Sequence, residues 1–257
     1  MTQKQSRATK QAASQRAAEK AAAIRREQQV KERRRRTLVV SVVVVAVLAL
    51  ILGIGYAVQA NRDTTGQASS APHGASGGYG VPVGKASAPA HVSVYEDPMC
   101  PYCGAFETAS RSWVQKDINA GKLQMNYHMV AFLDQNSTTQ YSSRAVNAMA
   151  AVLNSSGPTV FKKFHDLLYE NQPQEGSAGL SDAKLLSLAV QAGANKSAVS
   201  DAISKKSYEQ WATNATDAMS KHGVTGTPTV FVNGKKFNYT SVQSLSSELQ
   251  QAVSAQH

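Results

Sequence analysis

The stretch Asp97-Pro98-Met99-Cys100-Pro101-Tyr102-Cys103 contains both cysteines of this 257-residue chain. Two residues separate them, a spacing found in zinc sites and in redox-active pairs. A zinc site needs four ligands, usually from two such pairs, and the sequence has no second pair. A structural disulfide that closes so small a loop would add little stability. The stretch therefore predicts a redox-active pair and no bound metal.

The segments on either side of the cysteines predict a strand, a helix and a second strand. Apolar and polar side chains alternate over 91–95 and 123–129, and the intervening residues 104–120 form a plausible helix that ends at Gly121. This order predicts a right-handed βαβ unit with Cys100 at the carboxyl end of the first strand, where open α/β sheets place their chemistry. Pro101 suits the first helical turn, because the N–H that proline lacks has no helical partner there.

Nearly all of the net charge of +10 belongs to the N-terminal arm. Residues 1–36 hold 12 Lys and Arg and three Glu, and the remaining residues together carry only +1. The body of the protein therefore has no electrostatic footprint for DNA or RNA. A basic arm of this kind is attracted to anionic lipid, by about 1 kcal/mol per basic residue near the surface. We expect a cytoplasmic arm that lies in solvent or at a membrane surface.

The 21 residues 38–58 contain no charge and are long enough to span a membrane, at about 1.5 Å per residue. A cleaved signal peptide is the alternative, but the preceding arm is long and the apolar core exceeds the usual length of about 7–15 residues. We expect an uncleaved anchor over 37–60, with the arginines at 33–36 inside and the rest of the protein outside. Residues 61–80, rich in Gly and Ser, read as a flexible linker in which His73 is solvated.

The folded domain is expected over 81–257, and its middle is helical. Apolar side chains recur at helical spacing between about 140 and 222, interrupted at Gly157-Pro158, at 173–179 and at Gly193. His165 falls in this stretch and is read as a helix-surface or packing residue, and His128 is read as structural. Near the C-terminus, Pro228 opens a β-branched strand that a turn at 233–234 returns as a hairpin, followed by a helix from about Ser241.

This ordered set of features resembles the DsbA-like thioredoxin-fold thiol–disulfide oxidoreductases, of the membrane-anchored kind found in Gram-positive bacteria and actinobacteria. The matching segments are 84–89, Glu96-Asp97, the Cys-Pro-Tyr-Cys motif, 164–172 and 226–234. The resemblance covers about residues 81–255. It implies a thioredoxin fold, an α/β fold, with a helical insertion of about eighty residues over roughly 140–222.

The resemblance also assigns roles to site residues. Cys100 at the start of a helix would be the attacking sulfur, since the helix dipole and free N–H groups can lower a thiol pKa from about 8.5 to about 3.5–7.5. Cys103, one turn further, would be the resolving sulfur. Pro228 would be cis and pack against the pair, and the Thr227 backbone would bind an extended substrate. Well-known DsbA enzymes have His where Tyr102 stands, and this dipeptide, Pro101-Tyr102, tunes the reduction potential.

Glu96 and Asp97 have two interpretations from the sequence: buried proton acceptors for Cys103, or solvated carboxylates at a strand end. The resemblance implies a membrane-tethered enzyme, without a cofactor, that oxidises exported protein thiols outside the cytoplasm. Its partner would be a quinone-linked reoxidase of the DsbB or vitamin-K-epoxide-reductase type. A reductase, for instance in cytochrome c maturation, and a Cu(I)-binding module remain as alternatives.

Overall fold

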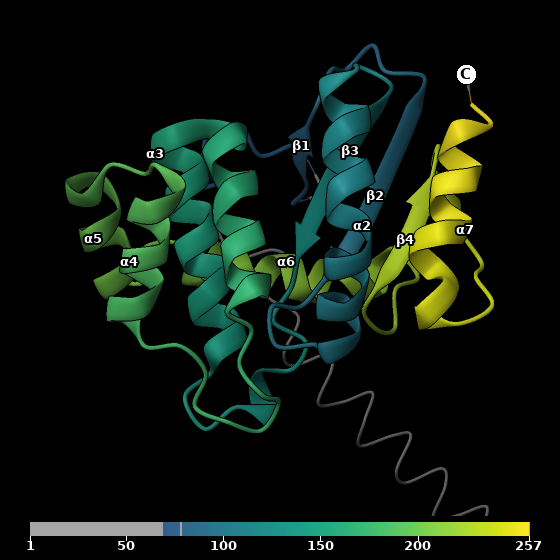
Figure 1. Cartoon of the computed structure of the whole chain (residues 1–257). Helices are drawn as coiled ribbons and strands as arrows, with labels where there is room; N and C mark the ends of the chain where they lie inside the picture. The colour runs from purple at the N-terminus through teal and green to yellow at the C-terminus, as the bar shows by residue number, and fades with distance from the viewer. Residues whose placement is uncertain (1–68, 78, 257) are drawn as a thin grey trace, which may run out of the picture. The chain divides into compact units, whose positions relative to one another are not determined.

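The computed structural model describes residues 69–77 and 79–256, all within the second of the two units into which the chain divides, Asp63–His257. A five-stranded sheet with the order β1-β3-β2-β4-β5 forms its centre (Figure 1). β2 and β3 run parallel, and the other neighbouring pairs are antiparallel. The strands are Val81–Val83 (β1), Ala90–Glu96 (β2), Leu123–Met129 (β3), Thr229–Val232 (β4) and Lys235–Lys236 (β5).

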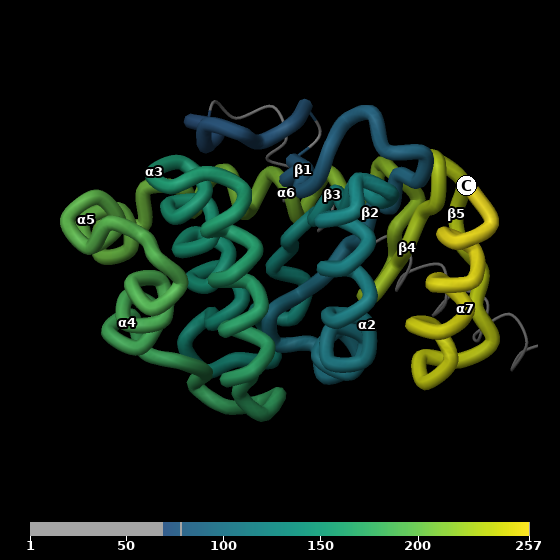
Figure 2. Tube along the Cα trace, turned by 45° about the horizontal axis from the view of Figure 1, so that its top comes forward, coloured from purple at the N-terminus to yellow at the C-terminus, as the bar shows by residue number. Residues whose placement is uncertain are grey.

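Helices cover both faces of the sheet. α2 and α7 lie together on one face and α6 crosses the other (Figures 1 and 2). α3, α4 and α5 pack together beside the sheet, and α3 also contacts α2 and β1. The helices are Pro101–Asn119 (α2), Tyr141–Glu170 (α3), Asp182–Ala192 (α4), Lys196–Ser204 (α5), Glu209–Lys221 (α6) and Val242–Ser254 (α7), with a 3₁₀ turn over Asp134–Asn136.

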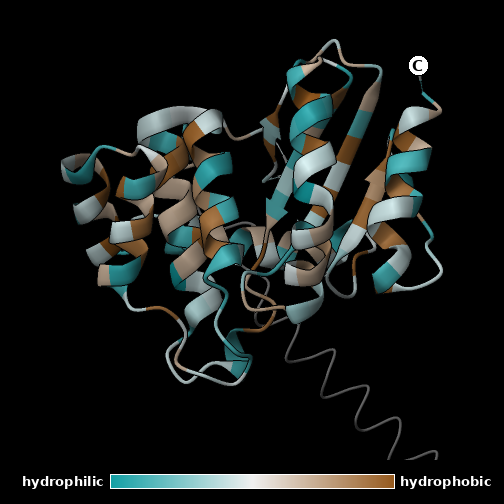
Figure 3. Ribbon diagram, in the orientation of Figure 1, coloured by the Kyte–Doolittle hydropathy of each residue, from teal (hydrophilic) through white to brown (hydrophobic). Residues whose placement is uncertain are grey.

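The core lies between the sheet and its helices. Most side chains of the two central strands, β2 and β3, are buried. Hydrophobic residues follow these strands and one side of the helices (Figure 3). Helix α3 bends at Gly157, whose φ of 78° and ψ of 178° are not helical. Pro158 follows the bend, because proline fits the first turn of a restarted helix. The break at Gly157 lets both ends of α3 reach Asp97, through the hydroxyl groups of Ser142 and Tyr169.

Most elements expected from the sequence are confirmed. The two strands, the helix between them and the hairpin with its following helix occupy the expected segments, and α3 to α6 fill the helical stretch. The hairpin turn has positive φ at Asn233 and Gly234, as its sequence predicts. The α/β thioredoxin-type fold is therefore confirmed. The three-residue strand β1 was not expected, because so short a run carries no periodicity.

The expectation of a flexible linker over 61–80 is wrong for the C-terminal end of this segment. Pro72 is buried, the backbone N–H of His73 donates to Oδ1 of Asn154 at 3.1 Å, and Ser76 pairs with Gly80. These contacts hold the backbone against the domain, although the His73 side chain is exposed as expected.

The basic arm 1–36 and the anchor 37–60 lie outside the described residues. Within the part that the structure describes, no helix is long and apolar enough to cross a membrane.

Candidate active site

Cys100 and Cys103 stand where β2 passes into α2. Cys100 is the residue before the helix, with extended backbone angles, and Pro101 occupies the first helical position. Both cysteines are free thiols. Cys100 keeps 4% of its surface exposed, Cys103 keeps none, and Tyr102 between them is 57% exposed. An incoming sulfur can therefore reach the pair only from the Cys100 side.

The two thiols have opposite pKa shifts. Hydrogen bonding from the Cys103 thiol and from N–H groups at the helix start outweighs burial and lowers the pKa of Cys100 to about 6. Burial, together with the negative charges of Glu96 and Cys100, raises the pKa of Cys103 well above its ordinary value. At neutral pH the reduced site therefore holds a thiolate on Cys100 and a thiol on Cys103, which is the distribution that an attacking and a resolving cysteine require.

The loop before β4 lies against this pair. The Thr227–Pro228 peptide bond is cis, as the resemblance implied, and Pro228 is buried. Sγ of Cys100 lies 3.5 Å from the carbonyl oxygen of Thr227. The Tyr239 hydroxyl donates to the carbonyl oxygen of Pro228 at 3.0 Å and so anchors the loop from the other side. Antiparallel pairing of β4 with β2 brings the loop to the cysteines.

Asp97 is fully buried, so the interpretation as a solvated carboxylate is wrong for it. Its carboxylate accepts hydrogen bonds from the N–H of Met99 at 2.8 Å, the Ser142 hydroxyl at 2.6 Å and the N–H of Leu133 at 2.7 Å. Burial nevertheless raises the pKa of Asp97 to about 7. The residue ties the segment before Cys100 to α3 and to the loop after β3.

Gln172, just beyond the end of α3, supports the same segment and was not singled out as a site residue from the sequence. Its Nε2 donates to the carbonyl oxygens of Pro98 at 3.1 Å and of Cys100 at 2.9 Å. Gly104 makes room for it, since a Cβ there would lie 2.0 Å from Oε1 of Gln172. The only sequence signal for Gln172 was its place in the matching segment 164–172.

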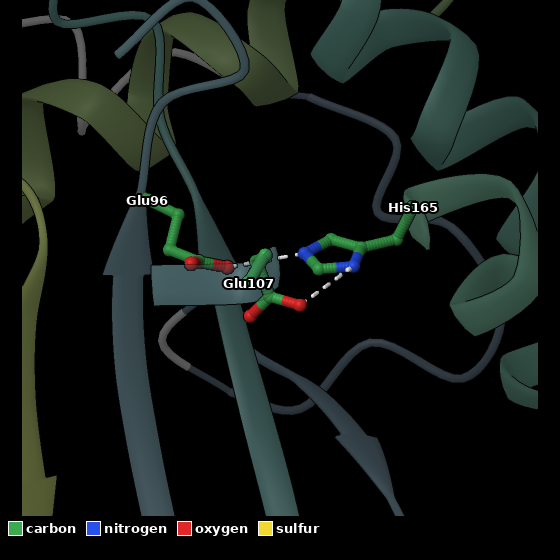
Figure 4. Close-up of side chains that lie close together, drawn as sticks. All are labelled: Glu96, Glu107 and His165. Atoms are coloured by element: carbon green, nitrogen blue, oxygen red, sulfur yellow. Dashed lines mark hydrogen bonds and ion pairs between the residues drawn. The ribbon is translucent and has the colours of Figure 1, made fainter. Parts of the chain in front are cut away.

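Beneath the cysteines lies a buried cluster formed by Glu96, Glu107 and His165, from β2, α2 and α3 (Figure 4). Nε2 of His165 lies 3.1 Å from Oε2 of Glu96, and Nδ1 lies 3.7 Å from Oε2 of Glu107. Glu96 and His165 are fully buried and Glu107 is 2% exposed. The solvated interpretation of Glu96 and the helix-surface interpretation of His165 are therefore wrong.

The pKa values of Glu96 and His165 in this cluster depart strongly from their ordinary values. Burial and the neighbouring Glu107 raise the pKa of Glu96 to about 8, against the lowering effect of His165. Burial would lower the pKa of His165, but Glu107, Asp166 and Glu96 together outweigh it and raise that pKa to about 9. His165 is therefore a cation at neutral pH. Neither Glu107 nor this role of His165 was evident from the sequence, because the three residues meet only in the folded chain.

Comparison with known proteins agrees with the fold. A family model described as thioredoxin matches residues 76–251. The reduced disulfide bond oxidoreductase DsbG of Mycobacterium tuberculosis is 30% identical with a TM-score of 0.60, over 71% of this chain and 94% of that one. The oxidised DsbA of the same organism is 32% identical with a TM-score of 0.58, over 68% of this chain and 92% of that one.

A curated relative is the serine/threonine-protein kinase PknE of Mycobacterium tuberculosis, 32% identical over 167 residues. The match covers 62% of this chain but only 30% of the kinase, so the chain spans less than a third of that protein's length. The similarity therefore concerns one part of PknE. Together with the family model and the solved structures, the matches show that the chain belongs to the thioredoxin family and, within it, to the DsbA-like thiol–disulfide oxidoreductases.

Proposed function

We propose that the protein introduces disulfides into exported proteins by exchange at Cys100 and Cys103. A substrate thiolate attacks Sγ of Cys100 in the oxidised enzyme, which breaks the Cys100–Cys103 bond and forms a mixed disulfide. A second substrate thiolate then attacks the substrate sulfur of that mixed disulfide, and Cys100 leaves as a thiolate. Two electrons pass from the substrate to the enzyme, whose two cysteines end reduced.

The opposite pKa shifts of the two thiols are the observation that carries this proposal. At pH 7 a thiol with a pKa of about 6, instead of the ordinary 9.0, is about 90% ionised. This ionisation stabilises the reduced enzyme roughly tenfold, which corresponds to about 30 mV in a two-electron potential. The site therefore favours accepting electrons from a substrate, which is the direction of disulfide formation.

The proposed location rests on the N-terminal sequence. With a cytoplasmic arm over 1–36 and an anchor over 37–60, the thioredoxin-type domain would work outside the cytoplasm, tethered to membrane lipid. Exported proteins would supply the thiols. A quinone-linked membrane reoxidase of the DsbB or vitamin-K-epoxide-reductase type would return the enzyme to its disulfide form. Thr227 would pair its backbone with the substrate strand beside Cys100.

A reductase would use the same residues in the opposite direction, and the reduction potential separates the two functions. We expect the full-length protein, equilibrated in glutathione buffers, to have a potential well above the thioredoxin value of about −270 mV. A potential at or below that value would establish the reductase. We also expect Cys103→Ser to trap mixed disulfides with substrates, and Cys100→Ser to form none. Failure of the pair to cycle, with stoichiometric copper in the purified protein, would instead support the Cu(I)-binding module.

A further inference from the structure

A surface cavity of about 260 Å³ lies at the edge of the sheet that β4 and β5 form. These two strands and α7 lie together at one end of the domain (Figure 2). The volume is below the roughly 300–1,000 Å³ of a typical small-molecule site, so the cavity suits a single side chain. Its lining consists of Thr229, Val230, Lys236, Phe237, Asn238 and Tyr239.

The cavity adjoins the loop that contains the cis peptide bond. Beyond β5 the chain continues beside β4, since the N–H of Phe237 donates to the carbonyl oxygen of Val230 at 2.8 Å. This pairing brings Tyr239 to the loop, where its hydroxyl donates to the carbonyl oxygen of Pro228. Burial raises the pKa of Tyr239, and the charges of the two active-site sulfur atoms raise it further. One wall of the cavity therefore lies within electrostatic reach of the reacting cysteines.

The cavity offers a cation and a polar amide to a ligand. Lys236 and Asn238 in its lining both carry N–H donors, and among the described residues no carboxylate lines it. The next carboxylate along the chain is that of Glu248 on α7, which accepts the N–H of Thr240 at 3.2 Å. Because a cation lines the cavity without a facing carboxylate, the cavity favours a negatively charged group.

The neighbouring Lys235 has the same charge but a different position. Lys236 stands opposite Phe231 of β4, and Lys235 stands opposite Val232. Successive side chains of a strand point to opposite faces of the sheet. Both lysines are exposed, but only Lys236 lines the cavity. The chain therefore contains a matched pair of lysines, with one inside the cavity and one outside it.

We propose that Lys236 determines substrate specificity, and that the cavity takes an acidic side chain, Asp or Glu, close in sequence to the reacting cysteine of the substrate. The inference rests on the proposed function, in which an extended substrate pairs with the Thr227 backbone beside Cys100. Side chains on one face of an extended segment recur every second residue, at intervals of about 7 Å. The side chain two positions from the substrate cysteine is therefore the one that reaches the cavity.

The contact between Lys236 and the substrate is an ion pair in which no covalent bond forms or breaks. It stabilises the encounter and the mixed disulfide, and it leaves the exchange at Cys100 as described. Lys236 is exposed, so water weakens the ion pair. Exposed ion pairs of this kind change a rate or affinity by roughly 1.5- to 5-fold. A basic side chain at the same substrate position adds repulsion, and we expect about fivefold between acidic and basic substrates.

The test is the rate at which the oxidised full-length protein oxidises reduced peptides that contain two cysteines. The peptides carry Asp, Asn or Lys either two positions before or two positions after each cysteine. Samples are quenched in acid, and mass spectrometry measures formation of the peptide disulfide. At one of the two positions we expect the Asp peptide to react about fivefold faster than the Lys peptide, with the Asn peptide between them.

Lys236→Glu should reverse this order at that position, because the substituted carboxylate repels Asp and attracts Lys. Lys235→Glu is the matched control, since it changes the net charge of the protein by the same amount. Long-range attraction of the peptides therefore changes equally in both variants. We expect Lys235→Glu to keep the wild-type order. Lys236→Gln removes the charge alone, and we expect the three peptides then to react at equal rates.

Other outcomes overturn the inference. If Lys235→Glu and Lys236→Glu change the order equally, the overall charge of the hairpin matters and the cavity is not a substrate site. Equal rates for all peptides with the wild-type protein would show that it has no preference for an acidic neighbour. If Lys236→Glu does not fold, the result with Lys236→Gln decides alone. If the wild-type protein oxidises none of the peptides, the proposed function itself fails, which is distinct from oxidation without preference.

Discussion

The carbonyl oxygen of Thr227 lies 3.5 Å from Sγ of Cys100, although 127 positions separate these residues in the chain. Neither residue could reach the other without the sheet. β4 pairs antiparallel with β2, so the loop that enters β4 lies beside the end of β2 from which the cysteine motif leaves. The attacking sulfur and the loop expected to bind substrate are therefore neighbours through strand pairing alone.

Tyr239→Phe tests how firmly this loop is held. The variant loses the hydrogen bond to the Pro228 carbonyl, and we expect the free energy of unfolding to fall by about 0.5–1.5 kcal/mol. Urea unfolding measures it. Tyr102→Phe, at a mostly exposed ring, is the matched control and should change stability by less than about 0.5 kcal/mol. Equal effects in both variants would show that the Tyr239 hydroxyl does not anchor the loop.

Cys103→Ala tests the origin of the low Cys100 pKa. Hydrogen bonding from the Cys103 thiol is the largest contribution to that pKa, so its removal should raise the pKa of Cys100 from about 6 toward the ordinary value. The rate of alkylation by iodoacetamide as a function of pH reports the change. Cys103→Ser keeps a donor and should leave the pKa of Cys100 lower than Cys103→Ala does. A pKa of Cys100 that stays equally low in both variants would mean that the helix N–H groups dominate.

Asp97→Asn tests the buried carboxyl beside Cys100. The folded pKa of Asp97 is raised from 3.8 to about 7, so the folded protein binds more protons than the unfolded chain between these values. The contribution of Asp97 to the free energy of unfolding is therefore fully present below about pH 4. It falls as the pH rises toward 7, by up to about 4 kcal/mol.

Asparagine cannot ionise, and its NH₂ group would place one donor against another, because backbone N–H groups donate to both oxygens of Asp97. We therefore expect the Asp97→Asn variant to be less stable than wild type at pH 5. The difference should shrink by pH 8. Urea unfolding of both proteins across this range isolates Asp97, because every other group titrates in both. A difference that grows with pH would mean that the folded pKa of Asp97 is not raised.

The effect of Gly104→Ala on the free energy of unfolding should change sign with the side chain at position 172. In the wild-type background the new Cβ would displace the Gln172 side chain and cost about 1–3 kcal/mol through its lost hydrogen bonds. In a Gln172→Ala background no such clash exists, and Gly104→Ala should stabilise the helix by about 0.5–1 kcal/mol. A double-mutant cycle measured by urea unfolding gives the coupling energy. Additive effects of the two substitutions on stability would show that the lack of a side chain at Gly104 does not serve to accommodate Gln172.

Local sequence patterns were enough to establish the class of fold and the two reacting sulfur atoms. Alternation along 91–95 and 123–129, the Asn233-Gly234 turn and the paired cysteines are local signals, readable because each depends on near neighbours in the chain. These signals place Cys100 at a strand–helix junction. Resemblance to a family then supplied the cis peptide before Pro228, which no local pattern distinguishes from a trans one.

The groups that surround the two sulfur atoms depend on long-range packing, which no local pattern reveals. Whether Glu96 and Asp97 were solvated or buried was open in the sequence, because burial depends on what packs over a strand end. His165 reaches Glu96 across 69 positions, and Gln172 reaches Cys100 across 72. Such pairs form when helices dock on a sheet, and docking is set by the whole core. The reacting sulfur atoms can be identified from the sequence, whereas the packing of α3 against β2 and α2 determines which ionisable groups surround them.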